Sequence, residues 1–300
     1  MRREMKNKRL TLQQREERTA WLTLIPLCAI LLIFRFIPIL VDFIMSFTNW
    51  DGGFKADFVG FNNYITLAKN GELWTMLKNS LLLLLYLPIR LFIAFIFALY
   101  IYEKLPGAKT FSILYYLPQM ISLVVLGSVI KYVFRNRGII NMLLQAISLE
   151  TVDFLGDGQN AIWVILFAMV WHGLGWQMLI LSGGLSSMDK NILEAATIDG
   201  AGYWQKLFHV IIPMMSRTIE YSIIVSIIFV FTGLYNFIFS ITNGGPGYST
   251  TTLDYMVYLK AFKNNGMMGM ACAVAVVLLV IVLVLVIVQR KAADKAGDWE

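Results

Sequence analysis

Long apolar stretches separated by short polar segments dominate the chain. A helix needs about 20 predominantly apolar residues to cross the hydrocarbon core of a bilayer, which is about 30 Å thick. Six stretches are long enough, and they cover residues 21–47, 80–102, 111–134, 161–184, 218–242 and 267–288. The pattern therefore predicts an all-α membrane protein with six transmembrane helices and no separate soluble domain.

The composition agrees with a membrane protein and excludes several other classes. Hydrophobic residues make up 58% of the chain and charged residues 15%, whereas soluble domains carry about 25% charged residues. Cys28 and Cys272 both lie in apolar stretches, which argues against a disulfide framework. His172 and His209 lie far apart in the sequence, so we expect no metal site. Basic residues are dispersed among the loops, and this distribution argues against nucleic-acid binding.

The loop charges predict the orientation. If both termini are cytoplasmic, the inner segments hold fifteen Lys and Arg residues and the outer segments hold eight, as the positive-inside rule requires. We therefore expect a cytoplasmic basic tail at 1–20, a membrane domain at 21–289 and a cytoplasmic tail at 290–300. The first apolar stretch is too long for a signal-peptide core, and no small-residue cleavage site follows it, so we expect it to be retained.

A polar loop at 185–217 separates the fourth and fifth stretches and is cytoplasmic in this orientation. Asp189 can cap a helix that starts near Lys190, because its side chain can accept from free backbone N–H groups. Gly200 or Gly202 can take the left-handed conformation that ends such a helix.

A second segment of this loop, 203–210, leads to Pro213, which should break the chain before the next span. The alanines and exposed apolar side chains of the loop suit a ridge that fits a partner's groove. The alternative is an interfacial helix lying on the lipid headgroups.

The order of residues in this loop carries a family resemblance. Glu194-Ala195-Ala196 is followed by Gly200 and then by Val210-Ile211-Ile212-Pro213. This pattern resembles the EAA motif of the inner-membrane permease subunits of ATP-binding-cassette importers. The usual ending is Ile-x-Leu-Pro, from which Val210 and Ile212 depart conservatively.

Two further patches resemble the carbohydrate-uptake branch of that family, and above all its first permease subunit, akin to the larger maltose-transporter permease. One patch is Thr242-Asn243-Gly244-Gly245-Pro246 followed by Ser249-Thr250-Thr251-Thr252. The other is Tyr116-Leu117-Pro118, with Gly138-Ile139-Ile140-Asn141 beyond it. The resemblance implies the type I importer permease fold, a bacterial or archaeal plasma membrane and multiple spans.

The resemblance also implies the partners and the coupling residues. The expected partners are a second permease that completes a heterodimer, two ATPase subunits, an extracytoplasmic solute-binding protein and membrane lipid. The residues that match the motif, and so would couple to the ATPase, are Glu194, Ala195, Ala196, Asp199, Gly200 and Ala201. The chain lacks a G-x-x-x-x-G-K-[ST] phosphate loop. We therefore expect no catalysis and no cofactor in this chain, with ATP and magnesium used by the partner ATPases.

Two helix faces are candidates for a solute path. Steps of three and four residues place one set on a single face of the fifth span: Ser222, Ser226, Phe229, Gly233, Asn236 and Ser240. A face of the fourth span carries Met169, His172, Gly173 and Trp176, with Trp171 and Gln177 beside it. Sugars offer apolar C–H faces that stack on aromatic rings and hydroxyls that need hydrogen bonds, and Asn236 supplies both donors and acceptors. Ordinary helix packing is the alternative for each face.

Arg35 and Arg90 lie deep within the first and second spans, where an unpaired charge costs several kcal/mol. Arg35 lies seven residues before Asp42, so the two share one helix face and could pair through neighbouring side chains. Arg90 has no partner in its own helix, and a structural anchor and a role in the solute path both remain open. Pro88 should kink the second span beside it.

The sequence therefore predicts the permease subunit of an ATP-driven, binding-protein-dependent importer that carries a sugar or oligosaccharide. One alternative keeps the machinery and changes the cargo to glycerol phosphate or another polar solute. Another is a stand-alone channel or secondary carrier, which would need no ATPase.

Overall fold

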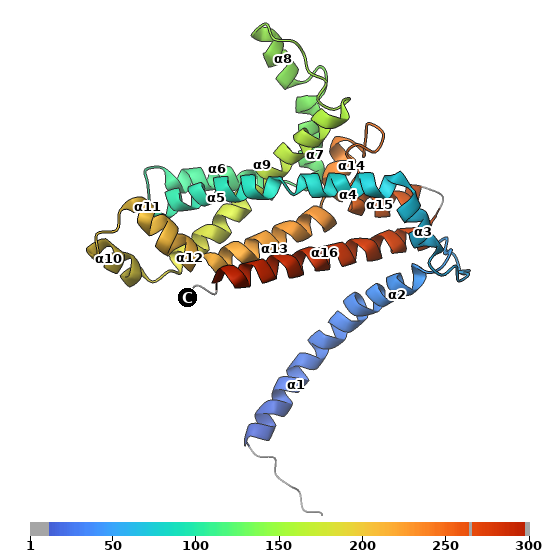
Figure 1. Cartoon of the computed structure of the whole chain (residues 1–300), viewed down its shortest axis with the longest axis horizontal. Coiled ribbons are helices and arrows are strands. Elements are labelled where there is room, and N and C mark those ends of the chain that lie inside the picture. The colour runs from blue at the N-terminus through green and yellow to red at the C-terminus, as the bar shows by residue number, and fades with distance from the viewer. Residues whose placement is uncertain (1–11, 264–265, 298–300) are drawn as a thin grey trace, which may run out of the picture.

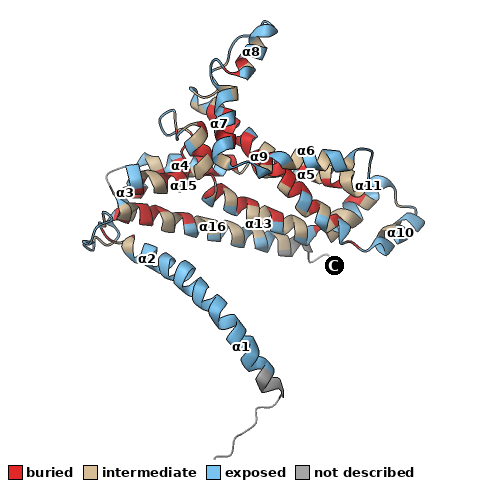
Figure 2. Ribbon diagram, turned by 180° about the vertical axis from the view of Figure 1, so that it is seen from behind, coloured by how far each residue is buried: buried red, intermediate tan, exposed pale blue. Residues whose placement is uncertain are grey.

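The computed structural model describes residues 12–263 and 266–297, whose regular structure is almost entirely helical. The described chain begins as an apolar arm that projects from the rest of the molecule and contacts it through α2, which packs on α16 (Figure 1). The arm consists of α1 (Leu12–Leu31), the π-helical turn η1 (Leu32–Phe36) and α2 (Ile37–Met45). None of the residues in its most apolar part is buried by the chain (Figure 2). Such a surface must be covered by lipid or by another protein.

The rest of the chain forms one helical body. Its first half contains α3 (Asn62–Lys69), α4 (Gly71–Leu83), α5 (Tyr86–Tyr102), α6 (Ala108–Met120), α7 (Leu123–Phe134) and α8 (Ile139–Ala146). Its second half contains α9 (Gly158–Ser186), α10 (Lys190–Ile198), α11 (Tyr203–Lys206), η2 (Leu207–Ile211), α12 (Ile212–Met214), α13 (Ser216–Thr232), α14 (Tyr235–Ile241), α15 (Leu253–Tyr258), η3 (Leu259–Lys263) and α16 (Met268–Gly297). The long helix α9 packs against α5, α6 and α13, so it forms the centre of the body.

The described helices confirm the predicted all-α membrane fold. Among the described residues, four helical stretches are long and apolar enough to span a membrane without a sharp bend: Glu16–Met45, Gly71–Tyr102, Gly158–Ser186 and Met268–Ala293. Two more are bent pairs, Ala108–Met120 with Leu123–Ala146 and Tyr203–Met214 with Ser216–Thr232. Six spans result when each bent pair is taken as one.

The third predicted span, 111–134, is not one continuous helix. The chain bends by 98° between α6 and α7, because Ile121 and Ser122 have extended ψ angles of 136° and 137°. The two halves have different neighbours, since α6 packs along α9 and α7 packs on α14. The bend itself was not predicted, because hydropathy measures how apolar a segment is and does not show which neighbour it packs against.

The fifth predicted span, 218–242, is interrupted as well. Helix α13 ends before Gly233, whose N–H donates to the carbonyl of Phe229 at 2.8 Å. A Cβ on Gly233 would lie 2.6 Å from the Phe229 ring, so only glycine fits this turn without a shift. The predicted continuous face from Ser222 to Ser240 was therefore wrong, because its two ends lie on different helices.

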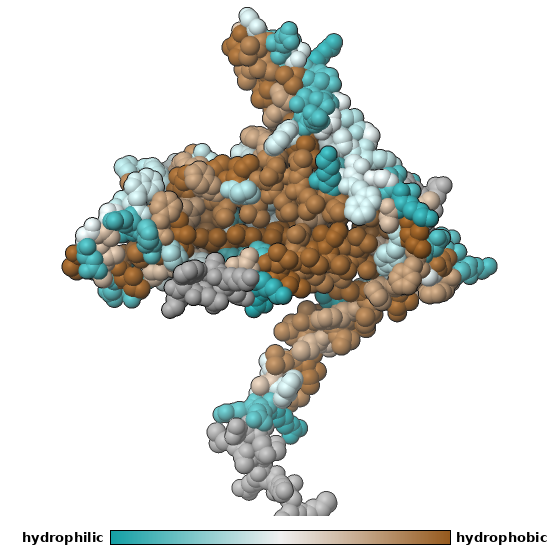
Figure 3. Space-filling model, in the orientation of Figure 1, coloured by the Kyte–Doolittle hydropathy of each residue, from teal (hydrophilic) through white to brown (hydrophobic). Residues whose placement is uncertain are grey.

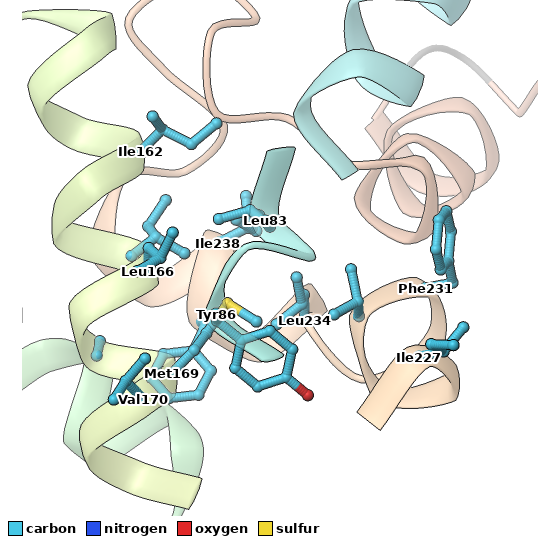
Figure 4. Packing of buried hydrophobic residues seen from close by; sticks show 14 of the residues in the cluster. Leu83, Tyr86, Ile162, Leu166, Met169, Val170, Ile227, Phe231, Leu234 and Ile238 are labelled. Atoms are coloured by element: carbon cyan, nitrogen blue, oxygen red, sulfur yellow. The ribbon is translucent and has the colours of Figure 1, made fainter. Parts of the chain in front are cut away.

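Buried apolar side chains from α4, α5, α9, α13 and α14 meet at the centre of the body (Figure 4). Leu83 ends α4 and Tyr86 begins α5, so these two residues flank the turn between the helices. Pro88 follows Tyr86 by two residues, in the first turn of α5. Met169 from α9 and Leu234 and Ile238 near α14 fill the same centre. Lipid tails are as apolar as these side chains, so close van der Waals packing holds the centre together more than exclusion of water does.

The surface agrees with membrane insertion. Apolar residues form a continuous band over the middle of the face seen in Figure 3, and hydrophilic residues gather toward the α10 end and the α3 end. The apolar band thus lies between two hydrophilic ends of the body, so the long axis of the body is the direction that would cross the membrane. The polar hairpin of α10 and α11 lies at one end of it (Figure 1).

The glycine- and threonine-rich segment between α14 and α15 is a compact turn packed onto α4. Asn79 donates to the carbonyls of Tyr248 at 3.0 Å and Thr251 at 2.9 Å. Gly244 has φ +86°, a conformation that favours glycine, and a Cβ there would lie 2.6 Å from Thr251 Oγ1. Glycine at 244 therefore allows the turn to close on the buried threonines.

Asp254 joins the starts of α14 and α15 beside this turn. Its carboxylate accepts from the backbone N–H of Tyr235 at 2.7 Å and of Tyr255 at 2.9 Å. Desolvation raises the pKa of the Asp254 carboxyl to about 6, although these N–H donors and the Thr252 hydroxyl lower it. A raised carboxyl pKa stabilises the fold below pH ~4, and this contribution is lost as the pH rises through about 6.

Candidate coupling hairpin and solute cavity

The predicted cytoplasmic helix forms where its local signals place it. Helix α10 spans Lys190–Ile198, and Asp189 Oδ1 accepts from the backbone N–H of Asn191 at 2.9 Å. Asp189 therefore satisfies one of the free N–H groups at the helix start.

Gly200 ends α10 in the left-handed conformation, with φ +83°. The N–H of Ala201 donates to the carbonyl of Ala196 at 2.9 Å, and the N–H of Gly200 donates to that of Thr197 at 3.1 Å. These two bonds are the Schellman pattern, which needs a residue that tolerates positive φ after the helix. In the motif, Gly200 and Ala201 follow Ala196 at the positions that a Schellman C-terminus of a helix requires.

Helix α10 has no buried residues, although several of its neighbours in the hairpin are apolar. Ile198 is 86% exposed and Trp204 is 67% exposed. Glu194, Ala195, Asp199 and Gly200 are also exposed, and Ala196 and Ala201 are half-buried. The motif residues therefore form an accessible surface with apolar side chains beside it.

The hairpin is tied to itself by a few polar contacts. Gln205 Oε1 accepts from the N–H of Gly202 at 2.8 Å, and Lys206 Nζ donates to Thr197 Oγ1 at 3.3 Å. A π-helical turn, η2, follows, and Pro213 lies in the first turn of α12. The helix break expected at Pro213 comes at Met215, two residues later. The helical segments Tyr203–Met214 and Ser216–Thr232 meet there at a bend of 64°.

Within the membrane body, a polar network joins α5, α9 and α13. Arg90 Nη2 donates to Gln177 Oε1 at 3.0 Å and to Ser226 Oγ. Gln177 Nε2 donates to Ser222 Oγ at 2.6 Å, and the Tyr86 hydroxyl donates to the Ser226 carbonyl at 3.0 Å. The guanidinium carbon lies 4.6 Å from the centre of the Tyr86 ring. The hydrogen-bond partners of Arg90 thus come from two other helices, α9 and α13. Its aromatic partner Tyr86 lies one turn earlier in α5 itself, so the expectation that Arg90 has no partner in its own helix was wrong.

A cavity of about 130 Å³ lies beside this network. Its lining comes from α5, α6, α9 and α13: Arg90, Gln119, His172, Gly173, Trp176, Val225, Ser226 and Phe229. His172, Gly173 and Trp176 belong to the face predicted on the fourth span. Ser226 and Phe229 belong to the face predicted on the fifth span. The structure therefore brings parts of the two candidate faces together around one cavity.

The remaining path candidates lie outside this lining. Met169 is 1% exposed and packs in the apolar centre. Ser222 is fully buried and bonded to Gln177. Gly233 forms the turn after α13, and Asn236 lies half-buried on α14. Helical spacing identified part of each face that lines the cavity. It could not show where a helix ends.

The predicted pairing of Arg35 with Asp42 does not occur in the described part of the chain. Asp42 instead accepts from Cys272 Sγ of α16 at 3.2 Å. Arg35 lies in the exposed π-helical turn η1, which alters the helical spacing between the two residues. A seven-residue spacing predicts a shared face only on a regular helix.

Two residues that line the cavity, Gln119 and Val225, were not predicted from the sequence. Gln119 is a polar residue within an apolar span, and that signal could have found it. Val225 carries no such signal, because valine is common in any membrane helix. The role of Arg90 as a cavity residue was left open because its partners lie 87 and 136 residues away.

Residues 90–295 match the model of the family described as "binding-protein-dependent transport system inner membrane component". This chain belongs to that family. The match begins at the arginine of the polar network and includes α10. It confirms the predicted resemblance and makes the chain a membrane subunit of a transport system.

Curated proteins and solved structures agree with this assignment. The chain is 31% identical over 258 residues to a probable ABC transporter permease protein of Pyrococcus horikoshii, with 84% of this chain and 88% of that protein covered. It is 33% identical over 251 residues to the multiple sugar-binding transport system permease protein MsmF of Streptococcus mutans, with 82% of this chain and 85% of that protein covered.

A solved structure has the same fold. It is a chain of a bacterial alginate ABC transporter in complex with an alginate pentasaccharide-bound periplasmic protein. The TM-score is 0.81 at 20% sequence identity, with 94% of this chain and 96% of that chain covered. The likeness extends over nearly the whole fold.

Proposed function

We propose that the chain forms half of the translocation path of an ATP-driven importer for a sugar or oligosaccharide. The observation that carries this proposal is the lining of the cavity. The rings of Trp176 and Phe229 offer apolar surface for sugar C–H groups, and Ser226 offers a hydroxyl for hydrogen bonding. The name of the similar MsmF protein, a multiple sugar-binding transport system permease, supports the same cargo class.

A second permease would complete the path. The cavity of about 130 Å³ is smaller than the ~300–1,000 Å³ of ordinary ligand sites, as expected of a site shared between two subunits. The arm formed by α1, η1 and α2 is apolar and uncovered by its own chain. It therefore offers a surface that a second permease could bury.

Energy would enter at α10. The exposed motif residues and Ile198 form the surface on which an ATPase subunit would dock, with ATP and magnesium bound by that subunit. Two such subunits would draw together on binding ATP and shift the membrane helices between two states. ATP and the delivered solute would then bias one equilibrium from opposite ends of the molecule.

The orientation follows from the same assignment. With α10 in the cytoplasm, both termini are cytoplasmic and the turn packed by Asn79 faces outward. An extracytoplasmic binding protein would deliver solute on that side. The excess of Lys and Arg in the proposed inner segments supports this arrangement.

Replacing Trp176 with alanine tests the cavity. We expect a drop of about tenfold or more in ATP-driven sugar uptake, because stacking surface at the site is lost. Uptake is measured in proteoliposomes that hold the complete importer and its binding protein. Trp163→Ala is the matched control, since Trp163 lies on the same helix α9, is 53% exposed and does not line the cavity. Equal uptake by the two variants would count against the cavity as the solute path.

A further inference from the structure

Arg90 is held in the body by only part of its guanidinium group. The side chain is 5% exposed, and both of its hydrogen bonds to Gln177 and Ser226 come from Nη2. Nε is buried without a hydrogen-bond partner in the described chain. Nη1 lies against Gly173, where a Cβ would come within 2.2 Å of it. The structural contacts therefore leave two of the three guanidinium nitrogens, Nε and Nη1, without a hydrogen bond.

The charge of Arg90 lies against the Tyr86 ring but has no anionic partner among the described residues. None of the ion pairs among the described residues includes it, and no residue lining the cavity is acidic. A buried cation within a membrane span costs several kcal/mol unless an anion or strong acceptors compensate it. Ser226 and Gln177 are neutral acceptors, so they satisfy hydrogen bonds and leave the net charge beside the cavity.

The cavity has a second unsatisfied polar atom on the facing helix. Gln119 Oε1 of α6 is buried and has no partner in the described chain. An amide oxygen accepts hydrogen bonds from hydroxyl groups. Arg90 and Gln119 thus leave a free cationic donor and a free neutral acceptor around one cavity, with the rings of Trp176 and Phe229 beside them.

We propose that the cargo is an acidic carbohydrate, whose carboxylate or phosphate pairs with the Arg90 guanidinium while a sugar hydroxyl donates to Gln119. The inference rests on the proposed carbohydrate import and narrows its substrate class. A planar guanidinium binds carboxylate and phosphate through charge-assisted hydrogen bonds, which are stronger than neutral ones. A neutral sugar would leave the charge of Arg90 without an anionic partner in the membrane.

The test compares matched solutes on the wild-type importer. Proteoliposomes with the complete importer and its binding protein receive an equimolar mixture of glucose, glucuronate, glucose 6-phosphate, galactotriose and trigalacturonate. Mass spectrometry then measures what accumulates with ATP. We expect the acidic members to accumulate about tenfold or more above their neutral counterparts. Glucuronate or trigalacturonate identifies a carboxylate cargo, and glucose 6-phosphate identifies a phosphate cargo.

Variants at Arg90 then separate recognition from structure. Arg90→Gln should remove the preference for acidic solutes, and Arg90→Lys should retain part of it, because the lysine keeps the charge and loses the planar donor set. Assembly is checked by co-purification of the ATPase subunits. If the Arg90→Gln importer does not assemble, the comparison of acidic with neutral solutes on the wild-type importer still tests the proposed cargo class.

Two outcomes overturn the inference. One is equal or preferred accumulation of the neutral solutes by the wild type. The other is an unchanged ratio of acidic to neutral uptake in an assembled Arg90→Gln importer, which would leave Arg90 as a structural clamp only. Absence of ATP-driven accumulation of every sugar in the mixture would instead contradict the proposed carbohydrate import itself.

Discussion

Gly200→Pro is expected to abolish ATP-driven uptake while leaving the helical body intact. Proline fixes φ near −65° and has no N–H, whereas Gly200 has φ +83° and donates its N–H to the Thr197 carbonyl. The Schellman stop of α10 cannot form, so the docking surface proposed for the ATPase is lost. The measurement is solute uptake with and without ATP in proteoliposomes that contain the reconstituted complex.

Gly202→Ala is the control for this prediction. Gly202 lies two residues further along the same hairpin, has an ordinary φ of −69°, and a Cβ there would lie 3.7 Å from its nearest neighbour, Gln205 Oε1. We expect uptake by this variant to stay near that of the wild type. Full ATP-driven uptake by Gly200→Pro would show that coupling does not depend on the shape of this hairpin.

Gly175→Ala is expected to destabilise the membrane body strongly. A Cβ at Gly175 would lie 2.5 Å from the Tyr115 carbonyl oxygen and 2.6 Å from the Tyr116 Cα. Both atoms belong to the backbone of α6, so the whole helix must move away from α9. We expect a loss of about 1–3 kcal/mol, measured as a lower midpoint of thermal unfolding of the detergent-purified complex.

Gly183→Ala, on the same helix α9, provides the comparison. A Cβ there meets nothing within 4 Å, and alanine favours a helix more than glycine by about 1 kcal/mol. Its unfolding midpoint should equal or exceed that of the wild type. Equal midpoints for the two variants would contradict the close approach of α6 and α9 that positions Gln119 at the cavity.

The sequence predicted the helix α10 and its two ends well because its signals are local. Asp189 caps α10 within two residues. The helix ends at Gly200, where the Gly200 N–H donates to the carbonyl three residues back and the Ala201 N–H donates to the carbonyl five residues back. The six apolar stretches could be predicted as readily, because a stretch long enough to span a membrane can be recognised from its composition and length alone. In both cases the residues that determine the structure are neighbours in the chain.

The bends and the cavity could not be predicted because they depend on distant residues. Ile121 and Ser122 are extended where α6 and α7 part to reach different neighbours. Arg90 meets Gln177 and Ser226 only after α5, α9 and α13 have packed together. A periodic face on one span shows which residues share a side, while the opposite wall of a cavity comes from tertiary packing.

Photo-cross-linking from Ile198 tests the central claim most directly. This side chain is 86% exposed at the end of α10, and Phe92 of α5, which is 68% exposed within a membrane span, serves as the reference. With a photoreactive residue at each position in the assembled importer, we expect an adduct with the ATPase subunit from 198 and none from 92. An ATPase that co-purifies with the chain but forms no adduct from position 198 would contradict the claim that α10 is where energy enters.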